Sequence, residues 1–258
     1  TYTWLMGHSL GGLVAVNLVE KHPSDYDGIL TMAGMIGGSR AEIDYMGDVR
    51  NLFDFFYPNV LPGGVCELAM PPEDLIARII GAVMGDPNGL GAIAALTPLP
   101  GENSDQFVES LITAIDFNYR GQADLYERLD GECPYDNCDR VYAARFPVPP
   151  GLEDTVNAAI PRYCRVNSAD NYLGRYYEPT GRLSVEMMTV HLVHDPIVPV
   201  FHEQLYAEKV AVYGDIGLLE QRVLPGYGHT LEIPTPEIIE AFIDLRSKVV
   251  PAPVAFTR

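Results

Sequence analysis

The stretch Gly7-His8-Ser9-Leu10-Gly11-Gly12 decides the fold, because it reads G-x-S-x-G between two apolar segments. The residues before it, 2–6, are β-branched, aromatic or apolar and predict a buried strand. The residues after it, 13–21, are largely apolar and predict a helix that ends near His22. Glycines let the chain turn tightly here and hold the hydroxyl of Ser9 clear of the backbone. The sequence therefore predicts a strand, a strained turn at Ser9 and a helix.

Strands and helices alternate in both terminal parts of the chain. Residues 28–33 form a second apolar run, and two buried strands joined by a helix favour parallel pairing. The C-terminal part predicts four elements: a strand at 185–193, a helix at 201–213, a short strand at 220–224 and a last helix that opens at Thr235-Pro236. The sequence therefore predicts an α/β fold with a mostly parallel sheet.

The middle of the chain, residues 39–182, has a different pattern. Apolar residues recur there at helical spacing, as in 75–84 and 107–115, and Pro- and Gly-rich breaks separate the segments. We expect a large, mainly helical cap or lid inserted into the sheet. The predicted core then consists of residues 1–38 and 183–258.

An isolated serine hydroxyl is a poor nucleophile and needs a base within hydrogen-bond reach and an acid that orients the base. Asp195 follows the predicted strand 185–193 in the loop His194-Asp195-Pro196, where a proline fixes the backbone. His229 follows the next predicted strand and lies between Gly228 and Thr230. The chain thus offers a nucleophile, an acid and a base, each after a strand.

Three segments carry a family resemblance: GHSLGG at residues 7–12, HDPIVPV at 194–200 and GYGHT at 226–230. In this order they resemble the α/β-hydrolase superfamily, most of all its secreted esterases and lipases. The resemblance implies that Ser9 is the nucleophile, Asp195 the acid and His229 the base. It also implies an oxyanion hole made by the backbone N–H of Leu10 and a second donor from an earlier loop, with no metal and no cofactor.

Other assignments of the same residue types are weaker. Some relatives place the acid after the strand that follows the serine, but the loop 34–38 contains no carboxylate and the next one is Glu42. His191 and His194 are three residues apart in a predicted strand and should face opposite sides, so we expect a core histidine and a loop histidine rather than metal ligands. His8 flanks the serine and is a candidate for contact with substrate.

Composition limits the partners. The chain has 258 residues and a formal net charge of −18, with 47% hydrophobic residues. It has only three lysines and no basic cluster, which argues against nucleic acid and anionic membrane surfaces as partners. No apolar run reaches the roughly 18 residues of a membrane span, since the segment 75–84 contains Arg78.

Four cysteines, Cys66, Cys133, Cys138 and Cys164, lie in the middle block without zinc-ligand spacing. Two disulfides would suit a secreted or extracytoplasmic enzyme, and reduced buried thiols are the alternative. The sequence allows three pairings, of which we favour Cys133–Cys138 with Cys66–Cys164. The acidic loop 130–139 is then a solvated, disulfide-closed loop rather than a calcium site.

The resemblance also implies strands that the chain does not contain. In that fold four strands, or about 100 residues at roughly 30 per repeat, precede the serine strand. We therefore expect this chain to be part of a larger polypeptide whose N-terminal portion stays associated and supplies the second oxyanion donor.

The sequence predicts a serine hydrolase that cleaves carboxylic esters of small molecules with an apolar acyl or aromatic group. Aromatic residues at 53–57 and 172–177 could line such a site, although packing of the cap is the simpler explanation. A peptidase or amidase with the same triad and a catalytically inactive binding module are the alternatives. An N-terminal nucleophile at Thr1 is a weaker one, given the complete triad.

Overall fold

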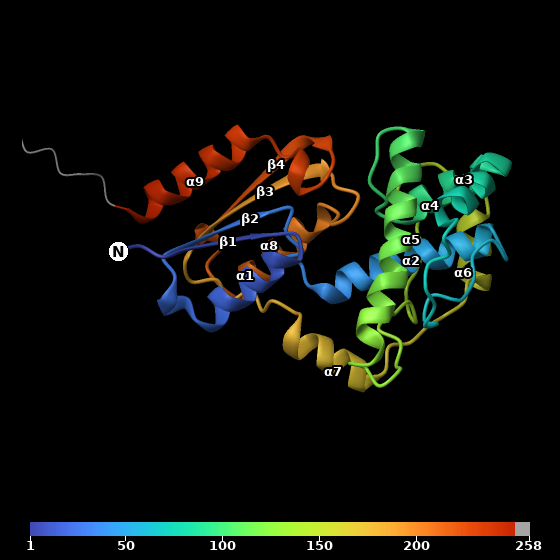
Figure 1. Ribbon diagram of the computed structural model, residues 1–258, viewed down its shortest axis with the longest axis horizontal. Coiled ribbons are helices and arrows are strands. Elements are labelled where there is room, and N and C mark those ends of the chain that lie inside the picture. Colours follow the sequence, from blue (N-terminus) through green and yellow to red (C-terminus); the bar gives the residue numbers. More distant parts are fainter. Residues whose placement is uncertain (251–258) are drawn as a thin grey trace, which may run out of the picture. The chain divides into compact units, whose positions relative to one another are not determined.

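The computed structural model describes residues 1–250 and divides into two compact units (Figure 1). The first, which we call the sheet unit, consists of residues 1–38 together with 177–250. The second, which we call the helical unit, consists of Ser39–Tyr176. The end of the middle block predicted at Arg182 lies between the last helix of the helical unit and the next strand.

The sheet unit is built on a parallel sheet of four strands in the order β1-β2-β3-β4. The strands are β1 (Trp4–His8), β2 (Gly28–Met32), β3 (Glu186–His194) and β4 (Leu219–Tyr227). Gly7 pairs with Thr31, and Thr31 pairs with Thr189, so the strands end near one another. Because all strands run the same way, the loops that follow them meet at one edge of the sheet.

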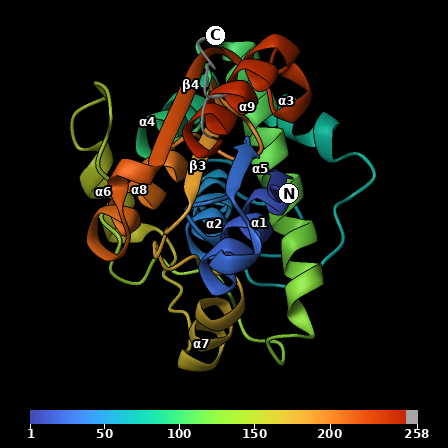
Figure 2. The same ribbon diagram turned by 90° about the vertical axis from the view of Figure 1, so that its left-hand side faces the viewer.

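Helices cover both faces of this sheet (Figures 1 and 2). Helices α1 (Leu10–Lys21) and α8 (Phe201–Tyr213) share one hydrophobic cluster that includes Ile29 of β2 and Met187 of β3. Helix α9 (Thr235–Val249) packs on the other face, where Leu30 and Met188 lie in a second cluster. Successive residues of a strand point to opposite faces, so each buried strand contributes to both clusters. Short 3-10 turns complete the unit at Pro23–Asp25, Ile216–Leu218 and Thr230–Glu232.

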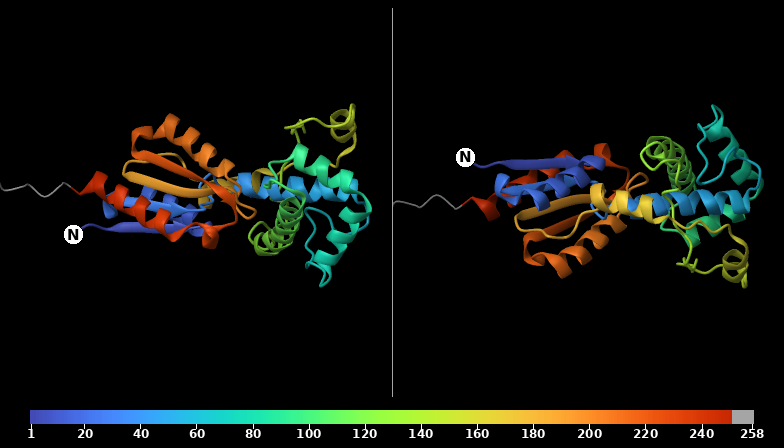
Figure 3. Two further views of the ribbon diagram at one scale, coloured as in Figure 1. Left: turned by 90° about the horizontal axis from the view of Figure 1, so that it is seen from above. Right: turned by 90° about the horizontal axis from the view of Figure 1, so that it is seen from below.

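The helical unit consists of α2 (Ser39–Phe56), α3 (Leu75–Gly85), α4 (Pro87–Leu96), α5 (Ser104–Tyr126), α6 (Leu152–Ala159) and α7 (Asn167–Tyr176). The long helices α2 and α5 contact each other, and Figure 3 shows them in two further views. Within residues 1–250 no single helix is long and apolar enough to cross a membrane, although α3 and α4, bent by 102°, pass the same test as a pair.

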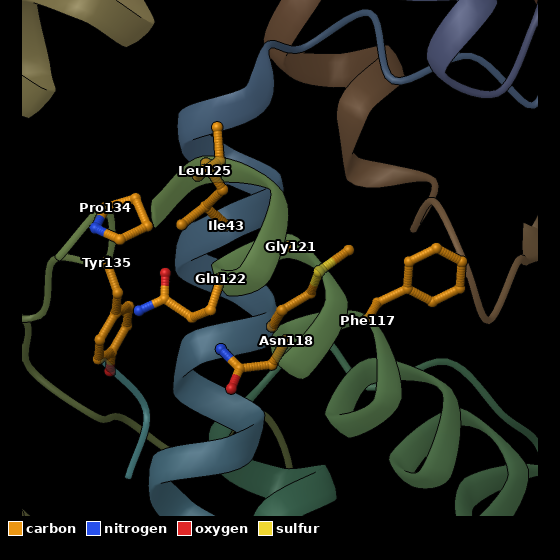
Figure 4. A pocket seen from close by; sticks show the side chains of 9 residues that line it. Ile43, Phe117, Asn118, Gly121, Gln122, Leu125, Pro134 and Tyr135 are labelled. Atoms are coloured by element: carbon orange, nitrogen blue, oxygen red, sulfur yellow. The ribbon is translucent and has the colours of Figure 1, made fainter. Parts of the chain in front are cut away.

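Helices α2 and α5 leave a small cavity of about 20 Å³ between them (Figure 4). Ile43 of α2 and the amide side chains of Asn118 and Gln122 of α5 line it, together with Tyr135. A cavity of this size holds about one water molecule. It is a packing defect rather than a substrate site.

The structure corrects the predicted disulfides. Cys66 is bonded to Cys133 and Cys138 to Cys164, with Cα–Cα distances of 5.2 Å and 4.8 Å. The loop 130–139 is therefore not closed on itself by Cys133–Cys138.

Two hydrogen bonds between Asn137 and Tyr163 explain the correction. The N–H of Asn137 donates to Tyr163 O at 3.0 Å, and the N–H of Tyr163 donates to Asn137 Oδ1 at 2.7 Å. These bonds bring the next residues, Cys138 and Cys164, side by side. The residues between Cys133 and Cys138 are held against the unit instead of forming a tight turn, since Tyr135 and Asn137 are both 1% exposed.

A buried polar network lies beside the loop. Asp48 of α2 is 2% exposed and accepts hydrogen bonds from the hydroxyls of Tyr135 at 2.8 Å and Tyr142 at 2.7 Å. It also pairs with Arg140. Burial raises the pKa of Asp48 to about 6 against the opposing charge of Arg140. Burial of the ionised form of Asp48 therefore lowers the stability of the fold at neutral pH.

We expect this network to make stability fall as the pH rises. A carboxyl whose pKa is higher in the folded state stabilises the fold while it is protonated and loses that contribution as it ionises. The unfolding free energy of the parent, minus that of Asp48→Asn, should fall by about 2–3 kcal/mol between about pH 3.5 and pH 7. Urea unfolding followed by tyrosine fluorescence measures it, with the exposed Asp139→Asn as control. A difference that is flat or rises with pH contradicts the expectation.

Candidate active site

Ser9 lies in a strained turn between β1 and α1. Its backbone has φ 53° and ψ −129°, and a positive φ is uncommon for a residue with a side chain. The turn is held by its own backbone, since the N–H of Ser9 donates to Met32 O at 3.1 Å and its carbonyl accepts from the N–H groups of Gly12 at 2.9 Å and Met35 at 3.1 Å. Strain of this kind persists only where surrounding bonds enforce it, and it is typical of functional sites.

Two of the three glycines in the stretch 7–12 are needed for steric reasons. A Cβ on Gly7 would lie 2.3 Å from Gly11 O, and a Cβ on Gly12 would lie 2.7 Å from the Cα of Gly34. At Gly11 nothing lies within 4 Å, so the space there does not require glycine. The close approach of α1 to β1 and to the loop after β2 therefore explains Gly7 and Gly12.

Asp195 follows β3 and its side chain is fully buried. Its Oδ1 accepts from the N–H groups of Ile197 at 2.9 Å and Val198 at 3.0 Å, which fixes the carboxylate plane. Burial by itself raises the pKa of Asp195, but the hydrogen bonds and charges of His191 and His229 outweigh it, and the pKa lies below its ordinary value. Asp195 is therefore ionised and acts as an acceptor only.

His229 lies in the loop after β4 and pairs with Asp195. Its Nδ1 is 2.7 Å from Asp195 Oδ2, so Nδ1 carries the proton and Nε2 is left as an acceptor. Its backbone N–H donates to Glu232 Oε2 at 2.9 Å, which anchors the loop. Gly228 precedes it with φ 141°, and a Cβ there would lie 2.4 Å from the side chain of Glu232. The loop thus presents the ring of His229 to Asp195 in one tautomer.

The Nε2 of His229 is buried and has no hydrogen-bond partner among residues 1–250. A buried acceptor without a donor is costly, and such groups are often functional. The structure brings Asp195 and His229 together, and it places Ser9 after β1 of the same sheet, but the hydroxyl of Ser9 does not donate to His229 in this structure.

The other two predicted site residues flank Ser9. Leu10 is the first residue of α1, and its N–H belongs to the first turn, where backbone donors have no partner inside the helix. His8 ends β1 and is exposed. Their assignment to the oxyanion hole and to substrate contact stays a prediction.

The sequence did not anticipate a second histidine beside Asp195. His191 of β3 is fully buried, as expected for a core histidine, but its Nε2 lies 3.3 Å from Asp195 Oδ2. Its Nδ1 lies 3.0 Å from Glu203 of α8. Residues four apart along an extended segment point to the same side, so simple alternation already allows the contact of His191 with Asp195. Within the described part of the chain, no three His, Cys, Asp or Glu side chains form a group that could hold a metal ion.

No protein-family model matches the sequence, and no curated protein matches it. Solved structures, in contrast, do match the chain. The chain is similar to a monoacylglycerol lipase from Paleococcus ferrophilus, with 13% identity and a TM-score of 0.36 over 95% of this chain and 67% of that one. It is also similar to a serine hydrolase from Cycloclasticus zankles, with 12% identity and a TM-score of 0.37 over 95% and 63%.

A third similar structure is a meta-cleavage product hydrolase from Pseudomonas fluorescens, with 11% identity and a TM-score of 0.37 over 96% of this chain and 66% of that one. The chain thus spans about two thirds of the length of these three proteins. The parallel sheet covered by helices on both faces, with the Ser9 turn after β1 and the Asp195 and His229 loops after β3 and β4, has the arrangement of the α/β-hydrolase fold from its serine strand onward.

Proposed function

We propose that the chain is a serine hydrolase that cleaves carboxylic esters through Ser9, His229 and Asp195. The observation that carries the proposal is the pair of Asp195 and His229 at 2.7 Å, with His229 Nε2 left as an unpartnered acceptor. A base in this tautomer is ready to take a proton from a hydroxyl. The strained turn at Ser9, at the same edge of the sheet, supplies the hydroxyl.

The chemistry follows from these atoms. His229 Nε2 accepts the proton of Ser9 as Oγ attacks the ester carbonyl, and Asp195 stabilises the imidazolium that forms. The backbone N–H of Leu10 donates to the developing oxyanion. His229 then gives the proton to the leaving alcohol, which leaves an acyl group on Ser9. Water, activated by the same base, releases the acid and restores the serine.

Substrate class is a further part of the proposal. We infer an ester with an apolar acyl or aromatic group, in keeping with the aromatic residues of the helical unit. Phe53 and Tyr57 of that unit are 0% and 5% exposed and pack against each other at 4.9 Å, so they stabilise its core. Phe55 and Phe56 are half-buried within the same unit.

Hydrolysis of matched esters and anilides tests the proposal. We expect the chain to hydrolyse p-nitrophenyl esters of short and medium acyl chains, and p-nitroanilides of the same acids much more slowly. Ser9→Ala should abolish both activities, because no other nucleophile replaces the hydroxyl. Faster cleavage of the anilides points to the peptidase or amidase alternative. Equal rates for the parent and Ser9→Ala contradict a serine hydrolase.

The two disulfides favour an extracytoplasmic location, since such bonds persist in oxidising compartments. We propose that the protein works there. A thiol count of the protein purified from its natural source under denaturing, non-reducing conditions should find none of its four cysteines free.

A further inference from the structure

The ring of His191 is surrounded by acceptors. Its Nε2 lies 2.8 Å from Val198 O and 3.3 Å from Asp195 Oδ2, and its Nδ1 lies 3.0 Å from Glu203 Oε1. A neutral imidazole carries one N–H and one bare nitrogen, and the bare nitrogen would face an oxygen. An imidazolium has a hydrogen on each nitrogen and satisfies every contact. The geometry therefore fits the charged ring.

Glu203 is held as the anion that such a cation needs. Its Oε2 accepts from Thr189 Oγ1 at 2.5 Å and from Gln221 Nε2 at 2.7 Å, while Oε1 faces His191. Glu203 is 4% exposed and Thr189 is 0% exposed. A buried carboxylate is stable when it is paired and its oxygens are satisfied, as here.

The remaining titratable groups nearby agree with this charge distribution. His202 of α8 is fully buried, and its Nδ1 accepts the N–H of Gly37 at 3.1 Å, so that nitrogen carries no proton. Burial, and next the charge of His191, lower the pKa of His202 to about 3. Burial also lowers the pKa of His191, but Asp195 and Glu203 reverse this and raise it to about 10. The group thus contains one cation, His191, between two carboxylates, with His229 beyond Asp195.

We propose that His191 is a positioning residue of the active site: an imidazolium, fixed by Glu203, that holds the Asp195 carboxylate for His229 and limits how strongly Asp195 draws a proton onto His229. The inference rests on the proposed function. Asp195 Oδ2 is shared by the two rings, His229 at 2.7 Å and His191 at 3.3 Å. Because like charges repel, a cation on one side of Asp195 opposes a second cation on the other side.

The consequence concerns the imidazolium that His229 becomes when it takes a proton: the His191 cation on the other side of Asp195 opposes it. When the His191 cation is removed, this opposition is lost. The acid limb of the profile of log kcat/KM against pH must then move to higher pH. If His191 acted only as a hydrogen-bond donor to Asp195, its replacement would lower kcat/KM without moving the acid limb of the profile.

The decisive variant is the double substitution His191→Gln with Glu203→Gln. It replaces the ion pair by two neutral amides, keeps a donor toward Asp195 and avoids leaving Glu203 as an unpaired buried anion. With p-nitrophenyl butyrate as substrate, we expect the midpoint of the acid limb to rise by about one pH unit. Val210→Ala is the matched control. Val210 lies in α8, the helix of Glu203, and its side chain is fully buried and uncharged. The control substitution should lower stability and leave the midpoint in place.

A spectrum of the unaltered chain tests the charge without any variant. Long-range 1H–15N NMR of protein labelled at histidine nitrogens should show both ring nitrogens of His191 protonated at about pH 8, where an ordinary histidine is neutral. A bare nitrogen on His191 at that pH overturns the inference.

The outcomes separate the inference from the proposed function. A raised midpoint in the double variant, together with a doubly protonated His191, supports the inference. An unchanged midpoint, in a chain whose ester hydrolysis depends on Ser9, overturns the inference and leaves the proposed function standing. A chain that hydrolyses no ester, with or without Ser9, overturns both.

Discussion

His229→Ala is expected to slow ester hydrolysis about 10⁶-fold in kcat, the size of loss seen when the base of a serine triad is removed. The reason lies in Nε2, the one nitrogen of the Asp195–His229 pair that is free to accept a proton. Without it, Ser9 must attack as the neutral hydroxyl. The measurement is the steady-state rate on p-nitrophenyl butyrate, with the exposed His22→Ala as control.

The fall in kcat caused by His229→Ala should not multiply with the fall caused by Ser9→Ala. Residues that act as one unit lose most of their effect once any member is gone, so the double variant should be about as slow as either single variant. A His229→Ala chain that keeps more than a tenth of the parent rate contradicts the assignment of the base. Rates that multiply would mean that the two residues act in separate steps.

Asp195→Asn is expected to lower kcat about 10⁴-fold while the fold is retained. The amide can keep its oxygen toward the N–H groups of Ile197 and Val198, which places its NH₂ toward His229 and His191. A donor then faces Nδ1 of His229, and the ring must move its proton to Nε2 to make that hydrogen bond. Nε2 so protonated cannot take the proton of Ser9.

The matched control is Asp215→Asn, an exposed carboxylate of the sheet unit that accepts from the N–H of Gly217 at 2.9 Å. It should cost a little stability and no activity. The rate and the circular dichroism spectrum of both variants are the measurements. A loss of less than tenfold for a folded Asp195→Asn would show that another group orients the base.

The fold could be predicted because its signals are local. The strand predicted at 185–193 is an apolar run and is β3, and the helix predicted at 201–213 is α8 with the same ends. The strand predicted as buried at 2–6 is β1, which begins and ends two residues later and in which Met6 is 50% exposed. The Ser9 turn was predictable for the same reason, since Gly7 and Gly12 permit the close backbone approach that the structure shows. Asp195 and His229 follow their strands directly, so sequence order was enough to bring them to one edge.

The features that were missed depend on contacts between distant segments. The disulfides follow the pairing of Asn137 with Tyr163, which no spacing of cysteines reveals. The pairing of His191 with Glu203 joins β3 to a residue of α8, which sequence order alone does not bring together. A charged residue such as Glu203 in an otherwise apolar helix face was the available signal, because buried carboxylates are rare unless paired.

The position of a covalent fluorophosphonate adduct tests the central claim most directly. Such probes react with a serine that a neighbouring base activates. The folded chain is treated with the probe, digested and mapped by tandem mass spectrometry. The account predicts one adduct, on Ser9, that is lost in Ser9→Ala and in His229→Ala. A folded chain that takes no adduct, or takes it on another residue, contradicts the claim that Ser9 is the activated nucleophile.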